Sequence, residues 1–302
     1  MTAFLIKLIA CLAMLTDHAN NVFGSFGWAI LPDKISIILA YIGRIAFPIF
    51  AFMIVNGFIH TRNKRKYFSN MLLFGTIAQI PYTLALFLVN HMPLGTSERM
   101  TIFMWPWAIT LALSAIIIVI YIFVIWKKKK DASLIWLITA FVFLGLHLKV
   151  NGIWITSGDA LNVFYTLALG IAAIYLIQSI MERNKDFNWV NWSLLIVAFI
   201  AALLNIGVNS DYGIVGIALI IALYLCRKNK ALQAVVIIAW SFALYCIIIF
   251  NLRNAIASCF AIPFILFYNN KKGYRMKYAF YAFYPVHLLA LGIFNIVQRL
   301  ST

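Results

Sequence analysis

The sequence predicts an all-α membrane protein, a polytopic bundle of about 11 transmembrane helices that forms one integral-membrane domain over residues 1–302. Of the residues, 65% are hydrophobic and 11% are charged, whereas a soluble domain is typically about half apolar and a quarter charged. The apolar residues occur in long runs, and basic clusters recur between these runs. This pattern excludes a water-soluble fold, a disordered chain and a fibrous repeat.

Each predicted helix is an apolar run that ends where charged or turn-forming residues begin. Asp17 and His18 interrupt the first run, which is therefore a span rather than a cleaved signal peptide. The second run contains Arg44, and the eighth opens on Gly213 and Gly216, which favour close helix packing. The predicted helices are residues 4–24, 35–59, 67–90, 102–126, 132–148, 160–181, 190–206, 213–226, 231–250, 255–270 and 278–298.

The connections between these helices are alternately basic and weakly charged. By the positive-inside rule, the basic connections and the amino terminus face the cytoplasm and the carboxy terminus lies outside. Tryptophans agree with this register, since indole rings favour the membrane interface. The basic positions are Lys7 and residues 62–66, 127–130, 183–185, 227–230 and 271–277. The tryptophans near helix ends are Trp28, Trp105, Trp107, Trp126, Trp154 and Trp189.

The net charge of +16 comes from 24 Lys and Arg against 8 Asp and Glu. Because the cations lie in the loops of a membrane protein, we expect the lipid bilayer and not nucleic acid as a partner. The sequence has no Walker loop and no dinucleotide fingerprint. The cysteines form no CxxC pair, so we expect no metal site and no disulfide framework. They are Cys11, Cys226, Cys246 and Cys259.

Ionisable residues inside the predicted spans are the strongest indication of function. Such a residue at a helix centre costs about 2.5–3.5 kcal/mol on insertion scales, so it requires a partner, a water-filled cavity or a function. The candidates are Asp17 and His18 in the first span, Arg44 in the second and His287 in the last. At about 1.5 Å per residue, His18 and Arg44 share a layer. We therefore expect His18 and His287 to face one polar cavity with Arg44 nearby.

The same residues also have purely structural interpretations. Adjacent helical residues point about 100° apart, so Asp17 does not orient His18 by simple direct contact. A salt bridge between Asp17 and Arg44 is the structural alternative for this pair. Each histidine is alternatively a neutral imidazole that is hydrogen-bonded between helices. Pro285 frees a backbone carbonyl and kinks the last helix, which opens space beside His287.

Five ordered sequence blocks between residues 14 and 291 resemble the TraX family of conjugal pilin acetylation proteins. The chain differs from this family in an inserted two-helix hairpin, predicted at about 95–150. It also differs at Gln79, where the family has an acidic residue. The blocks are Met14–His18; Gly43–Phe50, continuing through Asn56-Gly57-Phe58, His60–Asn63 and Tyr67 to Gln79–Pro81; Asn162–Gly170; Asp211–Gly213 with Gly216; and Phe280–Leu288.

The resemblance implies a multi-pass acetyltransferase of the bacterial plasma membrane. It would move an acetyl group from cytoplasmic acetyl-CoA to an amine, such as a pilin-like amino terminus, or to a hydroxyl. In this interpretation His18 is a general base, and Arg44 stabilises charge on the thioester oxygen or anchors the donor. Asp17 raises the basicity of a nearby histidine if packing brings them together, and His287 is the second catalytic histidine.

The resemblance also implies where the substrates bind. The phosphates of CoA need cations on the cytoplasmic side, although basic loops occur in most membrane proteins of this kind. The nearest cluster is Arg62, Lys64, Arg65 and Lys66, together with Arg44. The expected substrate cavity contains Asn56, Asn162 and Tyr284. We expect a funnel that is open to the cytoplasm and narrows toward Arg44, with the acceptor arriving from the outer side or from the bilayer.

Two other functions stay open. The first is a transporter or channel in which the intramembrane Asp, His and Arg side chains form a proton or anion path. Inverted repeats with paired broken helices would favour it, and the sequence shows none. The second is an O-acetyltransferase of a surface glycan or lipid, which shares the acetyl-CoA donor and differs in the acceptor.

Overall fold

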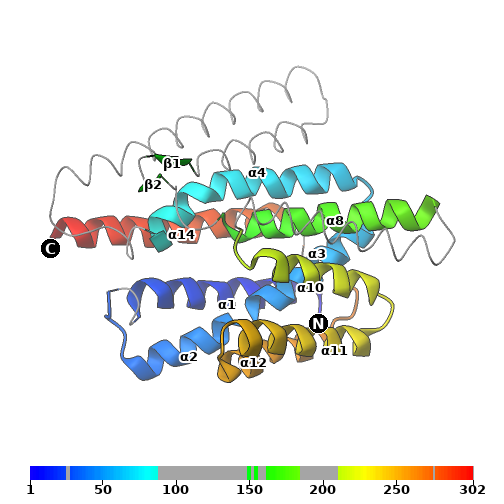
Figure 1. Ribbon diagram of the computed structural model, residues 1–302, viewed down its shortest axis with the longest axis horizontal. Helices are drawn as coiled ribbons and strands as arrows, with labels where there is room; N and C mark the ends of the chain where they lie inside the picture. Colours follow the sequence, from blue (N-terminus) through cyan, green and yellow to red (C-terminus); the bar gives the residue numbers. More distant parts are fainter. Residues whose placement is uncertain are drawn as a thin grey trace, which may run out of the picture.

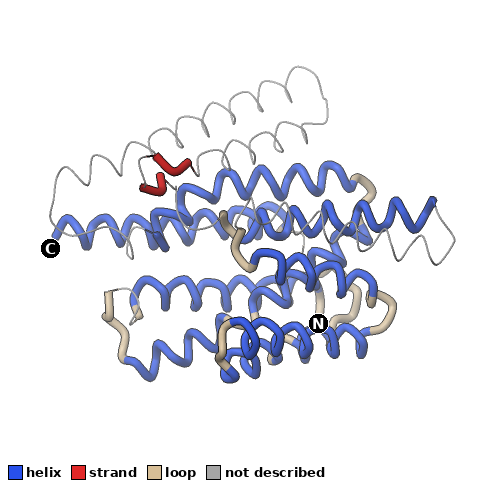
Figure 2. The backbone as a smooth tube through the Cα atoms, viewed as in Figure 1, coloured by secondary structure: helices blue, strands red, loops and turns tan. Residues whose placement is uncertain are grey.

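The computed structural model describes residues 1–24, 28–87, 148–150, 153–155, 161–183, 210–274 and 276–301. Within these ranges the chain is almost wholly helical, and Figures 1 and 2 show most of the helices running side by side along the long axis. The helices predicted at 102–126 and 190–206 lie outside these ranges. So does nearly all of the hairpin predicted at about 95–150.

Five described segments are long and apolar enough to cross a membrane. The outside of the bundle is apolar: Ile38, Val235 and Val297 are each 56% exposed, whereas His18 and His287 are buried. This arrangement is the reverse of a water-soluble protein and is typical of a bundle surrounded by lipid. A helical membrane protein is therefore confirmed, and the number of about 11 spans stays a prediction. The five segments are Ala3–Phe23, Asp33–His60, Val163–Glu182, Lys230–Ile248 and Tyr278–Gln298.

The first helices of the chain include one unexpected break. The single helix predicted at 35–59 is divided in two at Arg44. Pro48 explains this break, because proline has no N–H to donate to the Arg44 carbonyl. The elements are α1 (Ala3–Phe23), α2 (Asp33–Gly43), α3 (Ala46–His60) and α4 (Lys64–Tyr82).

The helix predicted at 67–90 is observed as α4 followed by a π-helical segment, η1 (Thr83–Phe87). Pro81 lies at the end of α4, and its missing N–H favours a change of hydrogen-bond register. The Asn295 amide of α14 (Lys277–Ser301) donates to the Ala85 carbonyl at 2.6 Å. A side chain of the last helix therefore satisfies a backbone group of this irregular segment.

The later predicted helices agree with the structure to different degrees. The predictions at 160–181, 213–226 and 278–298 are confirmed to within a few residues. The helix predicted at 231–250 is α-helical up to Phe242 and π-helical from Ala243 to Ile248. The helix predicted at 255–270 is observed as two short helices. The elements are α8 (Val163–Arg183), α10 (Gly213–Leu225), α11 (Lys230–Phe242), η2 (Ala243–Ile248), α12 (Leu252–Cys259), α13 (Ile262–Leu266) and α14.

Two short antiparallel strands correct the predicted end of the helix at 132–148. Strand β1 (Leu148–Val150) pairs with β2 (Ile153–Ile155), with Leu148 opposite Ile155. The sequence between them is Asn151-Gly152, which is typical of two-residue hairpin turns. The prediction of helix at residue 148 is wrong because this turn signal outweighs the apolar composition around it.

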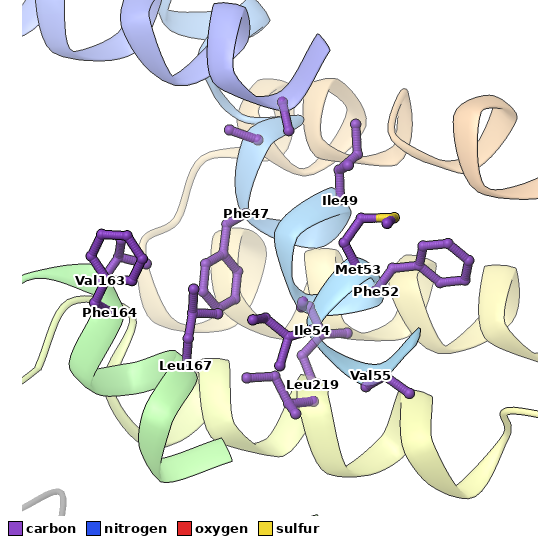
Figure 3. Packing of buried hydrophobic residues seen from close by; sticks show 14 of the residues in the cluster. Phe47, Ile49, Phe52, Met53, Ile54, Val55, Val163, Phe164, Leu167 and Leu219 are labelled. Atoms are coloured by element: carbon purple, nitrogen blue, oxygen red, sulfur yellow. The ribbon is translucent and has the colours of Figure 1, made fainter. Parts of the chain in front are cut away.

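Helix α3 is central in the described bundle, since it packs against α1, α8, α10 and α13. The residues of α3 itself are apolar on every face of the helix, which is typical of a fully buried helix. Figure 3 shows Phe47 and Ile54 of α3 beside Leu167 of α8 and Leu219 of α10. A Cβ atom at Gly216 would lie 2.7 Å from the Phe47 ring, so glycine permits this close contact between α10 and α3.

Asn162 joins α8 to α4. Its side-chain amide donates to the Gly75 carbonyl at 2.7 Å and to Gln79 Oε1 at 2.8 Å. Its own oxygen accepts from the Phe164 amide at 3.1 Å and so caps α8. Because the acceptor at position 79 is an oxygen, glutamine supplies the atom that an acidic residue would supply there.

We expect Asn162→Ala to lower the thermal unfolding midpoint in detergent by several degrees, because it removes a helix cap and the donor to the buried Gly75 carbonyl. Asn56→Ala is the matched control, since the Asn56 amide donates within its own helix, to the Phe52 carbonyl at 3.1 Å. The midpoint is measured by circular dichroism. Equal midpoints for the two variants would contradict the assignment of Asn162 as a link between helices.

Candidate functional site

His18 and His287 are in direct contact, although 269 residues separate them in the sequence. His18 Nδ1 and His287 Nε2 lie 2.8 Å apart, and the planes of the two rings are within 10° of parallel. Both side chains are buried where α1 packs against α14. The structure therefore brings into contact the two histidines that the sequence analysis expected to face one polar cavity, but neither of them lines either of the two cavities described below.

The hydrogen bonds of this pair define which ring nitrogens carry protons. The Phe283 carbonyl can only accept, so His287 Nδ1, 2.7 Å away, donates to it. In a neutral His287 ring the Nε2 atom is then an acceptor, and His18 Nδ1 donates to it. A neutral His18 therefore has its remaining nitrogen, Nε2, unprotonated. An unprotonated and oriented imidazole nitrogen is the form required of a general base.

Tyr284 packs against both histidines. Its ring contacts His18 edge-on, with centroids 5.8 Å apart, and His287 in the same way at 5.6 Å. The ring of Phe164 on α8 packs against its other side, with centroids 4.9 Å apart. The Tyr284 hydroxyl is buried and makes no hydrogen bond of normal geometry within the described residues. The Tyr284 O–H is therefore not donated to an acceptor within the described residues.

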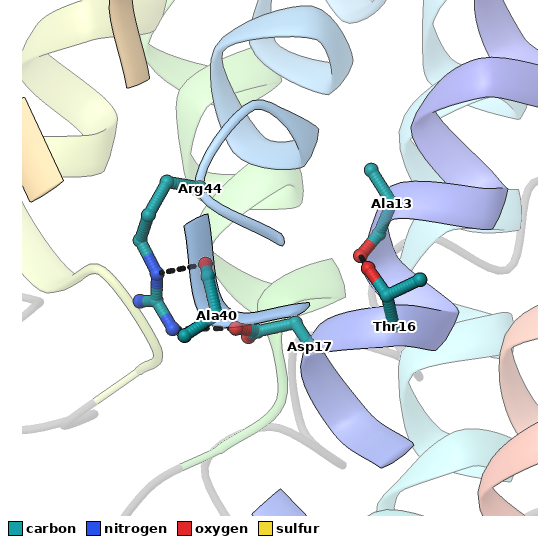
Figure 4. A network of polar contacts seen from close by, with 5 residues as sticks. All are labelled: Ala13, Thr16, Asp17, Ala40 and Arg44. Atoms are coloured by element: carbon teal, nitrogen blue, oxygen red, sulfur yellow. Dashed lines mark hydrogen bonds and ion pairs between the residues drawn. The ribbon is translucent and has the colours of Figure 1, made fainter. Parts of the chain in front are cut away.

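Asp17 and Arg44 form an ion pair beside the histidines. Arg44 Nη2 lies 2.5 Å from Asp17 Oδ1, and Arg44 Nε donates to the Ala40 carbonyl at 3.3 Å, as Figure 4 shows. A Cβ atom at Gly43 would lie 2.5 Å from Asp17, so the absence of a side chain lets α2 approach α1. The salt bridge that the sequence analysis gave as the structural alternative is therefore present.

Three residues near this ion pair were not identified as site residues from the sequence. The charge of Arg44 interacts with Tyr212 and Tyr245, and Asp211 interacts with both members of the pair. Tyr212 has a left-handed backbone, with φ of 59°, and Tyr245 lies in η2. Asp211 and Tyr212 belong to a block that resembles the family, but nothing in the sequence relates Tyr245 to Arg44.

Two adjoining cavities lead from one end of the bundle toward the histidines. We call the first the inner cavity: it has a volume of about 300 Å³, and it extends from Lys7 and His60 to Tyr284. We call the second the basal cavity: it has a volume of about 400 Å³, and Lys7 and Lys272 are among its lining residues. The two cavities share Lys7, Met53, Gly57, His60 and Phe280 as lining residues.

The cavities lie at the end of the bundle where α1 begins, which we call the basic end. The Ala3 amide donates there to the Lys271 carbonyl at 2.8 Å, so the loop before α14 packs on the start of α1. Figure 1 shows the N-terminus at this end and the C-terminus at the opposite end. The inner cavity therefore extends from the basic end to Tyr284, and none of His18, His287 and Arg44 lines it, although the sequence analysis expected a funnel that narrows toward Arg44.

The other predicted binding residues have different positions. Tyr284 lines the inner cavity and Asn56 lines the basal cavity, whereas Asn162 is a buried helix cap that lines neither. Lys64 bonds to Gln178 of α8 and lies 4.7 Å from the Phe58 ring. None of the predicted phosphate-binding cations of the α3–α4 connection lines either cavity; these are Arg62, Lys64, Arg65 and Lys66. In the described ranges, no group of three or more His, Cys, Asp or Glu is arranged to hold a metal ion.

Comparison with known proteins identifies the family. The sequence model of the TraX protein family matches residues 3–157 and 153–295. The chain belongs to the TraX family. It is also similar to a curated protein, "Probable fimbrial assembly protein FimC, serogroup H1" of Dichelobacter nodosus, with 25% identity over 294 residues that cover 96% of this chain and 94% of that protein. No solved structure shows a significant match.

Removing one member of the ion pair of this TraX protein should destabilise it more than removing both. Asp17→Asn or Arg44→Gln leaves one charge in the bundle without its partner, whereas the double variant leaves two neutral polar groups. We expect each single variant to have a lower thermal midpoint in detergent than the double variant. Arg253→Gln, at an exposed position, is the control. Additive losses in the double variant would contradict the coupling.

Proposed function

We propose that this TraX protein is an integral-membrane acetyltransferase that uses acetyl-CoA as donor. The observation that supports this function most directly is the hydrogen-bond chain from Phe283 through His287 to His18, which leaves His18 Nε2 as a base. A second observation is the inner cavity, which extends from the basic end to Tyr284, next to these histidines. A long donor whose anionic head stays at the basic end can reach Tyr284 through this cavity.

In this proposal, His18 performs the proton transfers of acyl transfer. Its Nε2 atom takes the proton of the acceptor amine or hydroxyl while the acceptor nitrogen or oxygen attacks the acetyl carbonyl carbon. The C–S bond then breaks, and the proton passes from His18 to the sulfur of the leaving CoA. His287 is a positioning residue, since it holds His18 in one tautomer and orientation and touches neither substrate.

Tyr284 is suited to stabilise the tetrahedral intermediate of this reaction. Its buried hydroxyl has no hydrogen bond of normal geometry in the described residues, and its ring lines the inner cavity beside His18. A phenol O–H directed at the developing oxyanion is a preorganised donor. Arg44 donates to Asp17 and Ala40, so we assign it a positioning role and place its charge within electrostatic range of His18.

The acceptor proposed for this chain is an amine at the membrane, such as the amino terminus of a pilin subunit. Its relative in Dichelobacter nodosus is called a probable fimbrial assembly protein, which favours a pilin-like acceptor over a surface glycan. The basic end would face the cytoplasm by the positive-inside rule. Acetyl-CoA would then enter from the cytoplasm, and the acceptor would arrive from the outer side or from the bilayer.

The hydrogen-bond chain does not favour a proton-conducting transporter. It ends at the Phe283 carbonyl, and a backbone carbonyl accepts a hydrogen bond but does not pass a proton onward. A proton that passes from His18 to His287 therefore has no further group to move to along this chain of hydrogen bonds. A general base returns its proton to the leaving group, so it needs only one unprotonated nitrogen.

Variants of the histidines test this function. With purified protein, acetyl-CoA and a peptide carrying a pilin-like amino terminus, we expect His18→Gln to lower kcat about 10²–10⁴-fold, because a general base is lost. His287→Gln keeps an oxygen that accepts from His18 Nδ1, so it should retain more activity than His287→Leu. Mass spectrometry of the peptide measures acetylation. Full activity in His18→Gln, or equal activity in the two His287 variants, would contradict the assigned roles.

Replacing Tyr284 with phenylalanine tests the oxyanion donor. Tyr284→Phe keeps the ring that packs against the histidines and removes only the hydroxyl. We expect kcat to fall about 10²-fold with little change in KM, because the hydrogen bond forms in the transition state. Tyr281→Phe, in the same cavity and on the same helix, is the control. A fall in both variants of equal size would indicate a general packing effect instead.

A further inference from the structure

The basal cavity contains the groups needed to bind a phosphorylated nucleotide. We propose that it holds the 3′-phosphate, diphosphate and adenine of acetyl-CoA while the thioester lies at Tyr284. This inference rests on the proposed acetyltransferase function and names the residues that bind the donor. The cations are Lys7 of α1 and Lys272 of the loop before α14, and the aromatic residue is Tyr274.

The charge of the basal cavity fits this ligand. Lys7 comes from α1 and Lys272 from the loop before α14, and Asn56 of α3 adds an amide to the lining. Lysine is a common phosphate-binding residue because it is a compact charge on a flexible stem. The cavity therefore combines two full positive charges in a small volume, which suits an anion that carries several phosphate charges.

The aromatic wall of the basal cavity is suited to bind a nucleobase. The Tyr274 ring is 80% exposed, and it packs on one side against Phe4, with ring centroids 5.7 Å apart. Phe4 also packs against Phe280 at 5.7 Å, so the Tyr274 ring is supported on one side and open on the other. An exposed and supported aromatic ring is a stacking surface for a nucleobase, since stacking does not depend on base identity.

The loop that carries these residues has a defined shape. Asn270 and Gly273 both have left-handed backbones, with φ of 59° and 69°. A Cβ atom at Gly273 would also lie 2.7 Å from Thr2 Oγ1. The Phe4 amide donates to the Lys272 carbonyl at 3.2 Å. These contacts fix Lys272 and Tyr274 against the start of α1, so the cavity wall exists before a ligand binds.

The distance between the two ends of the proposed site matches the donor. Lys7 and His18 lie on the same helix, 11 residues apart in α1, which corresponds to about 16 Å at 1.5 Å per residue. The pantetheine arm of CoA is a chain of roughly a dozen bonds, and an extended chain of that many bonds spans about 14 Å. A nucleotide beside Lys7 therefore places the thioester near Tyr284, whose ring packs against the His18 ring.

The cations of the α3–α4 connection are less suited to this role. Lys64 is directed toward Gln178 and the Phe58 ring, and Arg62 and Arg65 are exposed outside both cavities. Their charges raise the electrostatic potential at the basic end, but their side chains do not contact a ligand in the basal cavity. The phosphate contacts are therefore assigned to Lys7 and Lys272.

The experiment compares the double variant Lys7→Gln/Lys272→Gln with the matched double variant Arg62→Gln/Arg65→Gln. The protein is reconstituted in phosphatidylcholine vesicles, so that anionic lipid does not compete for the cavity. CoA binding is measured by titration calorimetry, and transfer is measured with acetyl-CoA and with acetyl-pantetheine, which lacks the nucleotide. Thermal midpoints in detergent show that both variants fold.

We expect the Lys7/Lys272 variant to bind CoA at least tenfold more weakly and to have a KM for acetyl-CoA raised by the same factor, with kcat unchanged, because anchoring is uniform binding. Its KM for acetyl-pantetheine should match that of the unmodified protein. Unchanged CoA affinity in this variant, or an equal loss in the Arg62/Arg65 variant, overturns the assignment. Binding that depends on Lys7 and Lys272 without transfer by the unmodified protein would support the subsite and refute the acetyltransferase function.

Discussion

The hydrogen bond between His18 and His287 joins the first and last of the described helices, and the chemistry available to the bundle depends on it. In a lipid environment a buried imidazole must find its partners within the protein. His287 is committed to the Phe283 carbonyl and accepts from His18. This arrangement leaves one unprotonated nitrogen beside Tyr284. The same contact that satisfies two polar groups therefore defines which atom can act as a base.

The irregular parts of the described helices lie next to these polar groups. The break between α2 and α3 contains Arg44, η2 contains Tyr245, and the left-handed Tyr212 precedes α10. A regular buried helix satisfies its own backbone and presents side chains only at fixed angles. Breaks and π segments change those angles, which is why such segments occur often at functional sites. Here they direct side chains from three elements toward the ion pair of Asp17 and Arg44.

Several features of the site could be predicted from residue types alone. Asp17, His18, Arg44 and His287 are costly in lipid wherever they lie, so their association could be inferred without coordinates. The helix break at Arg44 and the pairing of β1 with β2 had local signals in Pro48 and in the Asn151-Gly152 dipeptide between the strands, but the apolar runs around them favoured continuous helices. No feature of the sequence predicted that Tyr245 lies beside Arg44, because its position there depends on how η2 packs.

The sequence by itself determined the membrane class, the TraX family and the polar residues that need partners, because composition, ordered motifs and the cost of burial are properties of the chain. Only the tertiary structure decided which partners they have. The 2.8 Å contact between His18 and His287 spans 269 residues, and the meeting of Lys7 with Lys272 in one cavity depends on a loop folded back on α1. Such contacts are set by helix packing and loop geometry, which no local sequence pattern encodes.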